Sequence, residues 1–118
     1  MVAQSIIDSV RKYLQAVNAE GIPIEQGVIF GSQVRGVSDE WSDIDLLVIS
    51  KKFDHIRNRD DINLLWRIAA RTDSRIEPIA VGEYQFVEDD SSAIIEIARR
   101  EGQSVRIEET EEDTLNIA

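Results

Sequence analysis

Apolar residues recur at helical spacing in three stretches of the chain. These stretches are residues 5–17, 60–71 and 91–100. In each of them the apolar positions return every three or four residues, which places them on one face of a helix. Gly21 follows the first stretch and Gly102 follows the third, and glycine is typical of a helix end. The pattern therefore predicts three helices that face a core.

Shorter and denser apolar runs predict strands between these helices. The expected strands are residues 27–30, 44–49, 75–81 and 103–107. The second run is almost continuously apolar, so both of its faces are expected to be covered. Pro78 has no N–H to donate, which makes its strand an edge strand or one that is irregular beyond Glu77. The order of elements predicts an α/β (α+β) domain, a small mixed β-sheet packed by helices, over residues 1–107.

Composition narrows the classes of protein and partner. The 118 residues include 23 acidic and 13 basic side chains, for a formal net charge of −10, and no cysteine. The lack of cysteine excludes a disulfide framework and a thiolate metal site. Nucleic acid is not expected as the main partner, because affinity for phosphate backbones comes from lysine and arginine. The negative field favours a basic or protein partner, although solubility alone explains the acidity equally well.

Neither a membrane nor a secretory route is indicated. No apolar stretch approaches the roughly 20 residues of a membrane span, and the first residues lack the apolar core of a signal peptide. A cytoplasmic protein with no membrane partner is expected. Residues 108–118 contain the acidic run EETEED, which predicts a flexible C-terminal tail outside the domain.

Candidate chemistry is concentrated in residues 28–50, VIFGSQVRGVSDEWSDIDLLVIS. Asp43 and Asp45 are one strand repeat apart, so their side chains point to the same face. Mg²⁺ prefers carboxylate and phosphate oxygens, and two ions can clamp both sides of an in-line displacement. Gly31 lets a phosphate approach the main chain, and Ser32 adds a hydroxyl. A Mg-dependent nucleotide site is predicted; the alternative is a hairpin glycine beside a solvated strand end.

The motifs Gly31-Ser32, Arg35-Gly36 and Ser42-Asp43-Ile44-Asp45 occur in this order and at a specific spacing. They resemble the nucleotidyltransferase superfamily that contains DNA polymerase β, and in particular its minimal, single-domain branch. The similarity extends over residues 5–107. It implies the nucleotidyltransferase fold, with two Mg²⁺ ions as cofactors and ATP as the nucleoside triphosphate substrate.

The resemblance also assigns residues to the site. Asp43 and Asp45 are expected to bind the metals, together with a third carboxylate on a neighbouring strand. Glu77, in the sequence Arg-Ile-Glu-Pro, is the candidate, although the family more often has aspartate there. The alternative is that Glu77 is a solvated strand residue. Gly31, Ser32 and Arg35 are expected to contact the triphosphate, unless Arg35 is an ordinary surface charge.

The implied reaction is transfer of AMP from ATP to an acceptor hydroxyl, with pyrophosphate as the leaving group. Minimal members of the superfamily often act as antitoxins that place AMP on a tyrosine of a small helical HEPN-type toxin, so a protein acceptor is favoured. A small-molecule nucleotidyltransferase, similar to the aminoglycoside enzymes, is one alternative. A catalytically inactive antitoxin that binds its partner is another. The sequence leaves open whether the chain forms homo-oligomers.

Three large apolar residues complete the expectations. Trp66 lies on the apolar stripe of the second predicted helix and is expected in the core. Trp41 and Phe53 lie in segments that flank the Asp43–Asp45 strand, where no core role is apparent. They are expected to be exposed and available to a partner.

Overall fold

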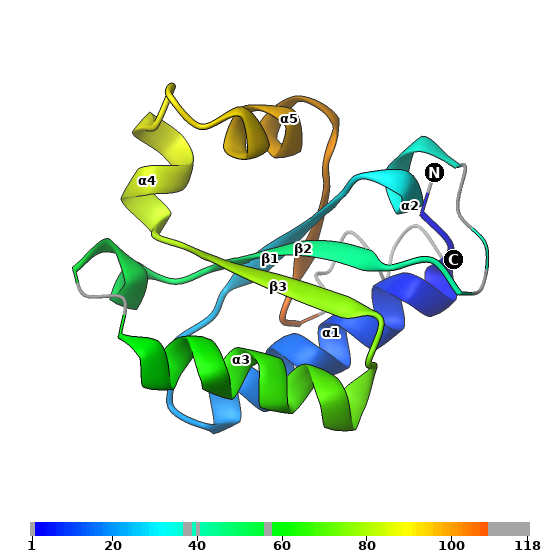
Figure 1. The fold of residues 1–118 in the computed structure, drawn as a ribbon, viewed down its shortest axis with the longest axis horizontal. Coiled ribbons are helices and arrows are strands. Elements are labelled where there is room, and N and C mark those ends of the chain that lie inside the picture. The colour runs from blue at the N-terminus through cyan, green and yellow to red at the C-terminus, as the bar shows by residue number, and fades with distance from the viewer. Residues whose placement is uncertain (1, 37–38, 40, 56–57, 109–118) are drawn as a thin grey trace.

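The computed structural model describes residues 2–36, 39, 41–55 and 58–108. Helices and strands alternate along this part of the chain (Figure 1). The helices are α1 (Gln4–Ala19), α2 (Ser32–Arg35), the 3-10 helix η1 (Lys51–Asp54), α3 (Arg59–Thr72), α4 (Glu83–Glu88) and α5 (Ala93–Glu101). The strands are β1 (Gln26–Phe30), β2 (Ile44–Ile49), β3 (Ile76–Val81) and β4 (Gln103–Arg106). The predicted helices and strands are all present, with ends that differ by at most two residues.

In the described residues the strands form one mixed sheet in the order β3-β2-β1-β4. Strand β1 is antiparallel to β2 and to β4, whereas β2 and β3 are parallel. The parallel pair is joined by a crossover that contains η1 and α3. The small mixed sheet predicted from the sequence is therefore confirmed. Strand β3 is an edge strand, which is one of the two arrangements expected from Pro78.

Helices cover both faces of the sheet (Figure 1). Alternate residues of β2, Ile44, Leu46 and Val48, pack in the core cluster that contains α1 and α3. Leu47 and Ile49 pack instead in the cluster that contains α5. This explains why the run is almost continuously apolar. The alternation also places Asp45, which has the parity of Leu47, on the α5 side of the sheet.

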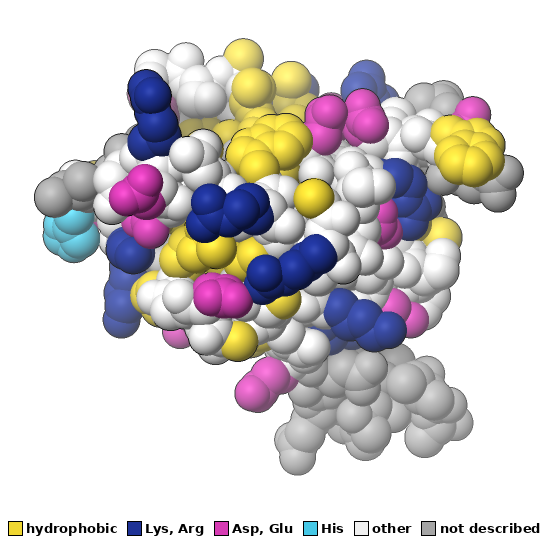
Figure 2. Space-filling model, turned by 60° about the horizontal axis from the view of Figure 1, so that its bottom comes forward, with side chains coloured by type: hydrophobic (Ala, Val, Ile, Leu, Met, Phe, Trp, Pro, Cys, Tyr) yellow, Lys and Arg dark blue, Asp and Glu magenta, His cyan; other side chains and the backbone are white. Residues whose placement is uncertain are grey.

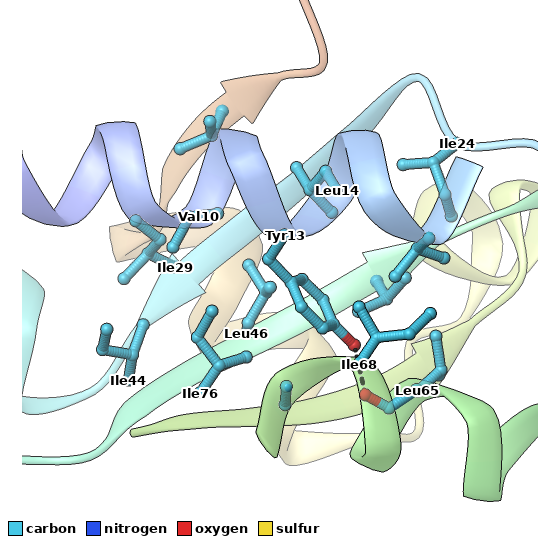
Figure 3. Close-up of a cluster of buried hydrophobic side chains, with 14 of the residues drawn as sticks. Val10, Tyr13, Leu14, Ile24, Ile29, Ile44, Leu46, Leu65, Ile68 and Ile76 are labelled. Atoms are coloured by element: carbon cyan, nitrogen blue, oxygen red, sulfur yellow. Dashed lines mark hydrogen bonds between the residues drawn. The ribbon is translucent and has the colours of Figure 1, made fainter. Parts of the chain in front are cut away.

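The larger core cluster fixes α1 against α3 and the sheet. Tyr13 is fully buried there, and its hydroxyl donates a hydrogen bond to the Leu65 carbonyl 3.0 Å away (Figure 3). Burial raises the pKa of the Tyr13 phenol, which therefore stays a neutral donor. Asn58 caps α3 by accepting from the Asp61 amide. These contacts fix the position of α3 on the sheet. Strand β3 follows α3 in the chain, and its first residues lie at the candidate site.

Two expectations about large apolar residues are wrong. Trp66 is 48% exposed, because it follows Leu65 by one position and is turned about 100° from that buried residue around the helix. Phe53 is 2% exposed, because η1 directs its ring into the core cluster of α1 and α3. Trp41 is 81% exposed, as expected. Phe53 is therefore not available to a partner protein.

Within the described part of the chain, no helix has the length and apolar character needed to cross a membrane. Residues 109–118, most of the predicted acidic tail, lie outside the described residues.

Candidate active site

The sheet brings the three predicted carboxylates to one place. Asp45 is paired in register with Glu77 on the neighbouring parallel strand β3. Asp43 lies one residue before β2 begins and has the same parity as Asp45. Because residues that alternate along adjacent strands share a face, all three carboxylates lie on the α5 side of the sheet. The candidate site therefore lies where β2 and β3 begin.

The carboxylates interact with one another. The pKa of Glu77 is raised, first by desolvation and then by the negative charges of Asp43 and Asp45, with hydrogen bonds to Asp45 and Asp43 contributing further. Such repulsion between like charges is relieved by a cation. Among the described residues, no group of three or more acidic, histidine or cysteine side chains is placed so that it could hold a metal ion. A metal here would need additional ligands such as phosphate oxygens and water, as Mg²⁺ commonly has.

Gly31 brings the backbone against Asp45. Its φ angle is +78°, in the region that favours glycine, and a Cβ added there would lie 2.4 Å from Oδ2 of Asp45. Helix α2 starts immediately afterwards at Ser32, and the Val34 and Arg35 amides donate to the Gly31 carbonyl. The glycine turn predicted to approach a phosphate therefore lies directly beside a predicted metal ligand.

Gly31→Ala should lower both stability and metal-dependent nucleotide binding. The backbone at Gly31, with φ 78° and ψ −146°, costs a residue with a Cβ about 1–3 kcal/mol, and the Asp45 carboxylate must rotate away to make space. The matched control is Gly21→Ala, because Gly21 has φ +101° but an added Cβ would meet nothing within 4 Å. Thermal unfolding should show destabilisation of both variants. Calorimetry with Mg-ATP should show weaker binding only for Gly31→Ala, and equal affinity in both variants would contradict this placement of Gly31.

The remaining predicted phosphate contacts come from α2. Ser32 is its first residue and is partly buried, while Arg35 is exposed in its last turn. Gly36 follows with φ +74° and ends the helix in the left-handed conformation typical of a C-cap. The structure thus presents the hydroxyl next to Gly31 and the guanidinium on the solvent side of the same turn.

Gln33 is a site residue that sequence reasoning missed. Its side chain is buried, and Nε2 lies 3.3 Å from the Ser42 carbonyl and 3.3 Å from the Asp43 carbonyl. In the sequence it lies between the motifs Gly31-Ser32 and Arg35-Gly36. Nothing in a single sequence distinguishes it from an exposed glutamine, because its two carbonyl partners lie nine and ten positions away along the chain.

Comparisons with known proteins agree with this geometry. The sequence profile of the family described as "Nucleotidyltransferase domain" matches residues 10–111. A comparison with curated proteins gave no match. One similar solved structure is that of a protein described as a nucleotidyltransferase, from Sulfolobus solfataricus, with 24% identity, 67% of this chain and 68% of that chain covered, and a TM-score of 0.50. Another is a toxin-antitoxin with AMP-PNP, with 18% identity, 89% of this chain and 78% of that chain covered, and a TM-score of 0.55. At these identities the two structures support the fold.

Proposed function

The chain belongs to the nucleotidyltransferase domain family, and from this premise we propose that it transfers AMP from ATP to a hydroxyl group of a protein partner. The observation that carries the proposal is the meeting of Asp43, Asp45 and Glu77 beside the Gly31 turn. Carboxylates that repel one another are suited to binding metal ions, and the glycine beside them lets a phosphate approach the backbone. The two features together are suited to a site that binds metal ions and phosphate.

Two Mg²⁺ ions are the proposed cofactor, with Asp43, Asp45 and Glu77 as their protein ligands. When bound, the ions would neutralise charge on the reacting phosphates and on the attacking oxygen. The residues fit this role in two ways. Desolvation, followed by the negative charges of Asp43 and Asp45, raises the pKa of Glu77. The absence of a Cβ at Gly31 lets Oδ2 of Asp45 lie against the backbone of the turn that is proposed to meet the phosphates.

The chain's own groups position the reactants. Ser32 and the first amides of α2 are proposed to hold the triphosphate, with Arg35 at its outer side. The acceptor oxygen forms a bond to the α-phosphorus, and the bond from that phosphorus to the pyrophosphate oxygen breaks. Glu77 is proposed to accept the proton of the acceptor hydroxyl, because its carboxylate lies opposite Asp45 on the same face of the sheet, next to the reacting groups.

A protein acceptor is supported by where the apolar surface lies. Among the described residues, most of the exposed large apolar side chains are on β3, α4 and α5, the side of the sheet that carries Asp45 and Glu77. These are Ile79, Tyr84, Val87, Ile94 and Ile97. A protein that covers them would have its own side chains next to the carboxylates.

Charge is unevenly distributed as well. Residues 83–101, which include α4 and α5, contain six acidic and two basic side chains. On the opposite face, where α1 and α3 come forward, lysine and arginine side chains gather (Figure 2); Arg59, Arg67 and Arg71 of α3 are among the exposed residues there. The α4 and α5 side therefore suits a partner with a basic rim. We propose a small helical protein of the HEPN type, with this chain acting as its antitoxin.

Intact-mass spectrometry tests the proposal. The chain is co-expressed with the protein of its neighbouring gene, and the purified complex is incubated with Mg-ATP. We expect the partner to gain the mass of one or more AMP units in the wild type and none with Asp43→Asn. A complex without any change in mass would favour an antitoxin that acts by binding alone. AMP found on a small alcohol, with no complex, would favour the small-molecule enzyme.

A further inference from the structure

Gln33 joins two parts of the candidate site that come from different elements. It belongs to α2, which follows Gly31, and only 5% of it is exposed. Its amide nitrogen Nε2 donates to the carbonyl oxygens of Ser42 and Asp43, each 3.3 Å away. These are the last two carbonyls before β2 begins at Ile44. A single buried amide thus connects the phosphate side of the site to the segment that carries Asp43.

The backbone at Asp43 needs such support because it lies outside the sheet. The register of β2 with β3 begins at Ile44, and the Ile44 amide donates to the Arg75 carbonyl 2.8 Å away. The pairing of β2 with β1 begins one residue later, at Asp45 opposite Phe30. Asp45 is therefore held by strands on both sides, whereas Asp43 is paired with neither. The Gln33 amide supplies hydrogen bonds where the strand pairing stops.

We propose that Gln33 is a positioning residue that fixes the Asp43 carboxylate relative to the Gly31 turn. The metal side and the phosphate side of the site would then keep one relative geometry. The inference rests on the proposed function, because it assigns Gln33 to the metal site that the function requires. Supporting hydrogen bonds of this kind typically change metal affinity or activity by about 10–100-fold when removed.

Gln33→Met in the full chain tests the proposal, because methionine has similar length but cannot donate to the two carbonyls. The control is Gln15→Met, since the exposed Gln15 side chain of α1 also donates to a backbone carbonyl, that of Ile107, 2.9 Å away. Mn²⁺ binding is measured by electron paramagnetic resonance in the presence of a non-hydrolysable ATP analogue, which supplies phosphate oxygens as further ligands. We expect about 10-fold or greater loss of affinity for Gln33→Met and none for Gln15→Met. Raised Mg²⁺ concentrations should restore transfer by Gln33→Met.

A second measurement separates positioning from the proposed reaction. Backbone amide NMR signals of Asp43 and Ile44 should shift in Gln33→Met and stay in place in Gln15→Met. If the wild type neither binds Mn²⁺ nor transfers AMP, the proposed function fails, while shifted signals still support the positioning link. If the wild type binds Mn²⁺ and Gln33→Met binds it within twofold, the Gln33 inference is overturned. Should Gln33→Met not fold, Gln33→Asn, which keeps the donors on a shorter arm, is measured in the same way, with unchanged affinity again overturning it.

Discussion

Asp45→Asn is expected to reduce nucleotidyl transfer by about 1,000-fold or more, since removing one uncharged electrostatic stabiliser already costs about 100–1,000-fold. Asp45 lies at the centre of the site, paired with Glu77 on one strand and with Phe30 on the other. Its Oδ2 lies beside Gly31. Asparagine has nearly the same shape, so packing is kept while a negative charge is lost.

Pyrophosphate release under single-turnover conditions measures this effect. Calorimetry with ATP, with and without Mg²⁺, should show that the metal-dependent part of binding is lost as well. Asp60→Asn is the control, because Asp60 is an exposed carboxylate in the first turn of α3. Equal ATP affinity with and without Mg²⁺, in wild type and Asp45→Asn alike, would remove Asp43 and Asp45 from a metal site.

The parts of the fold that were predictable are those with long, regular patterns. The stripes of α1, α3 and α5 repeat over several turns, and β2 is apolar on both faces because both faces are buried. Each such pattern is a local consequence of burial, so one sequence is sufficient to read it. The convergence of Asp43 and Asp45 was predictable for the same reason, since Ile44 alone separates them and side chains two positions apart in an extended chain share a face.

Helix α4 shows why other parts were not predictable. Its six residues are too few to display a helical period. Its first turn is satisfied from elsewhere in the chain, because the Tyr84 and Gln85 amides donate to the Asp54 carboxylate. Because the capping carboxylate belongs to η1, this cap leaves no signal in the residues adjacent to α4 in the sequence. The same applies to Gln33, whose carbonyl partners are nine and ten positions away.

Placing Glu77 in the site required both the sequence pattern and the pairing of strands in the structure. Strand alternation placed it on one face of β3, but only the pairing of β2 with β3 places it opposite Asp45. The expectation that Glu77 is a partner of the two aspartates therefore gains geometric support that the sequence could not give. Its role in metal binding and proton transfer is tested by a variant whose effects on activity and stability have opposite directions.

Glu77→Gln is expected to reduce transfer by about 100–1,000-fold while making the metal-free protein more stable at neutral pH. The activity falls because glutamine removes a charge and the proposed base. The stability rises because the folded-state pKa of Glu77 lies above its ordinary value of 4.5, so ionisation is less favourable in the folded chain than in the unfolded chain. Functional sites commonly sacrifice stability in this way.

The stability difference between wild type and Glu77→Gln should depend on pH. Well below pH 4.5 Glu77 is protonated in both the folded and the unfolded chain, and the stabilities of wild type and Glu77→Gln should differ little. As pH rises through the raised pKa, the wild type loses stability that Glu77→Gln retains, so the difference grows and then levels off. Thermal unfolding in EDTA from pH 4 to 8 measures it, with Glu25→Gln, a change at an exposed glutamate before β1, as the control. Added Mg²⁺ should stabilise the wild type more than Glu77→Gln. A variant that keeps full turnover, or that is less stable than the wild type throughout this range, would show that Glu77 is a structural residue of the edge strand and not a member of the site.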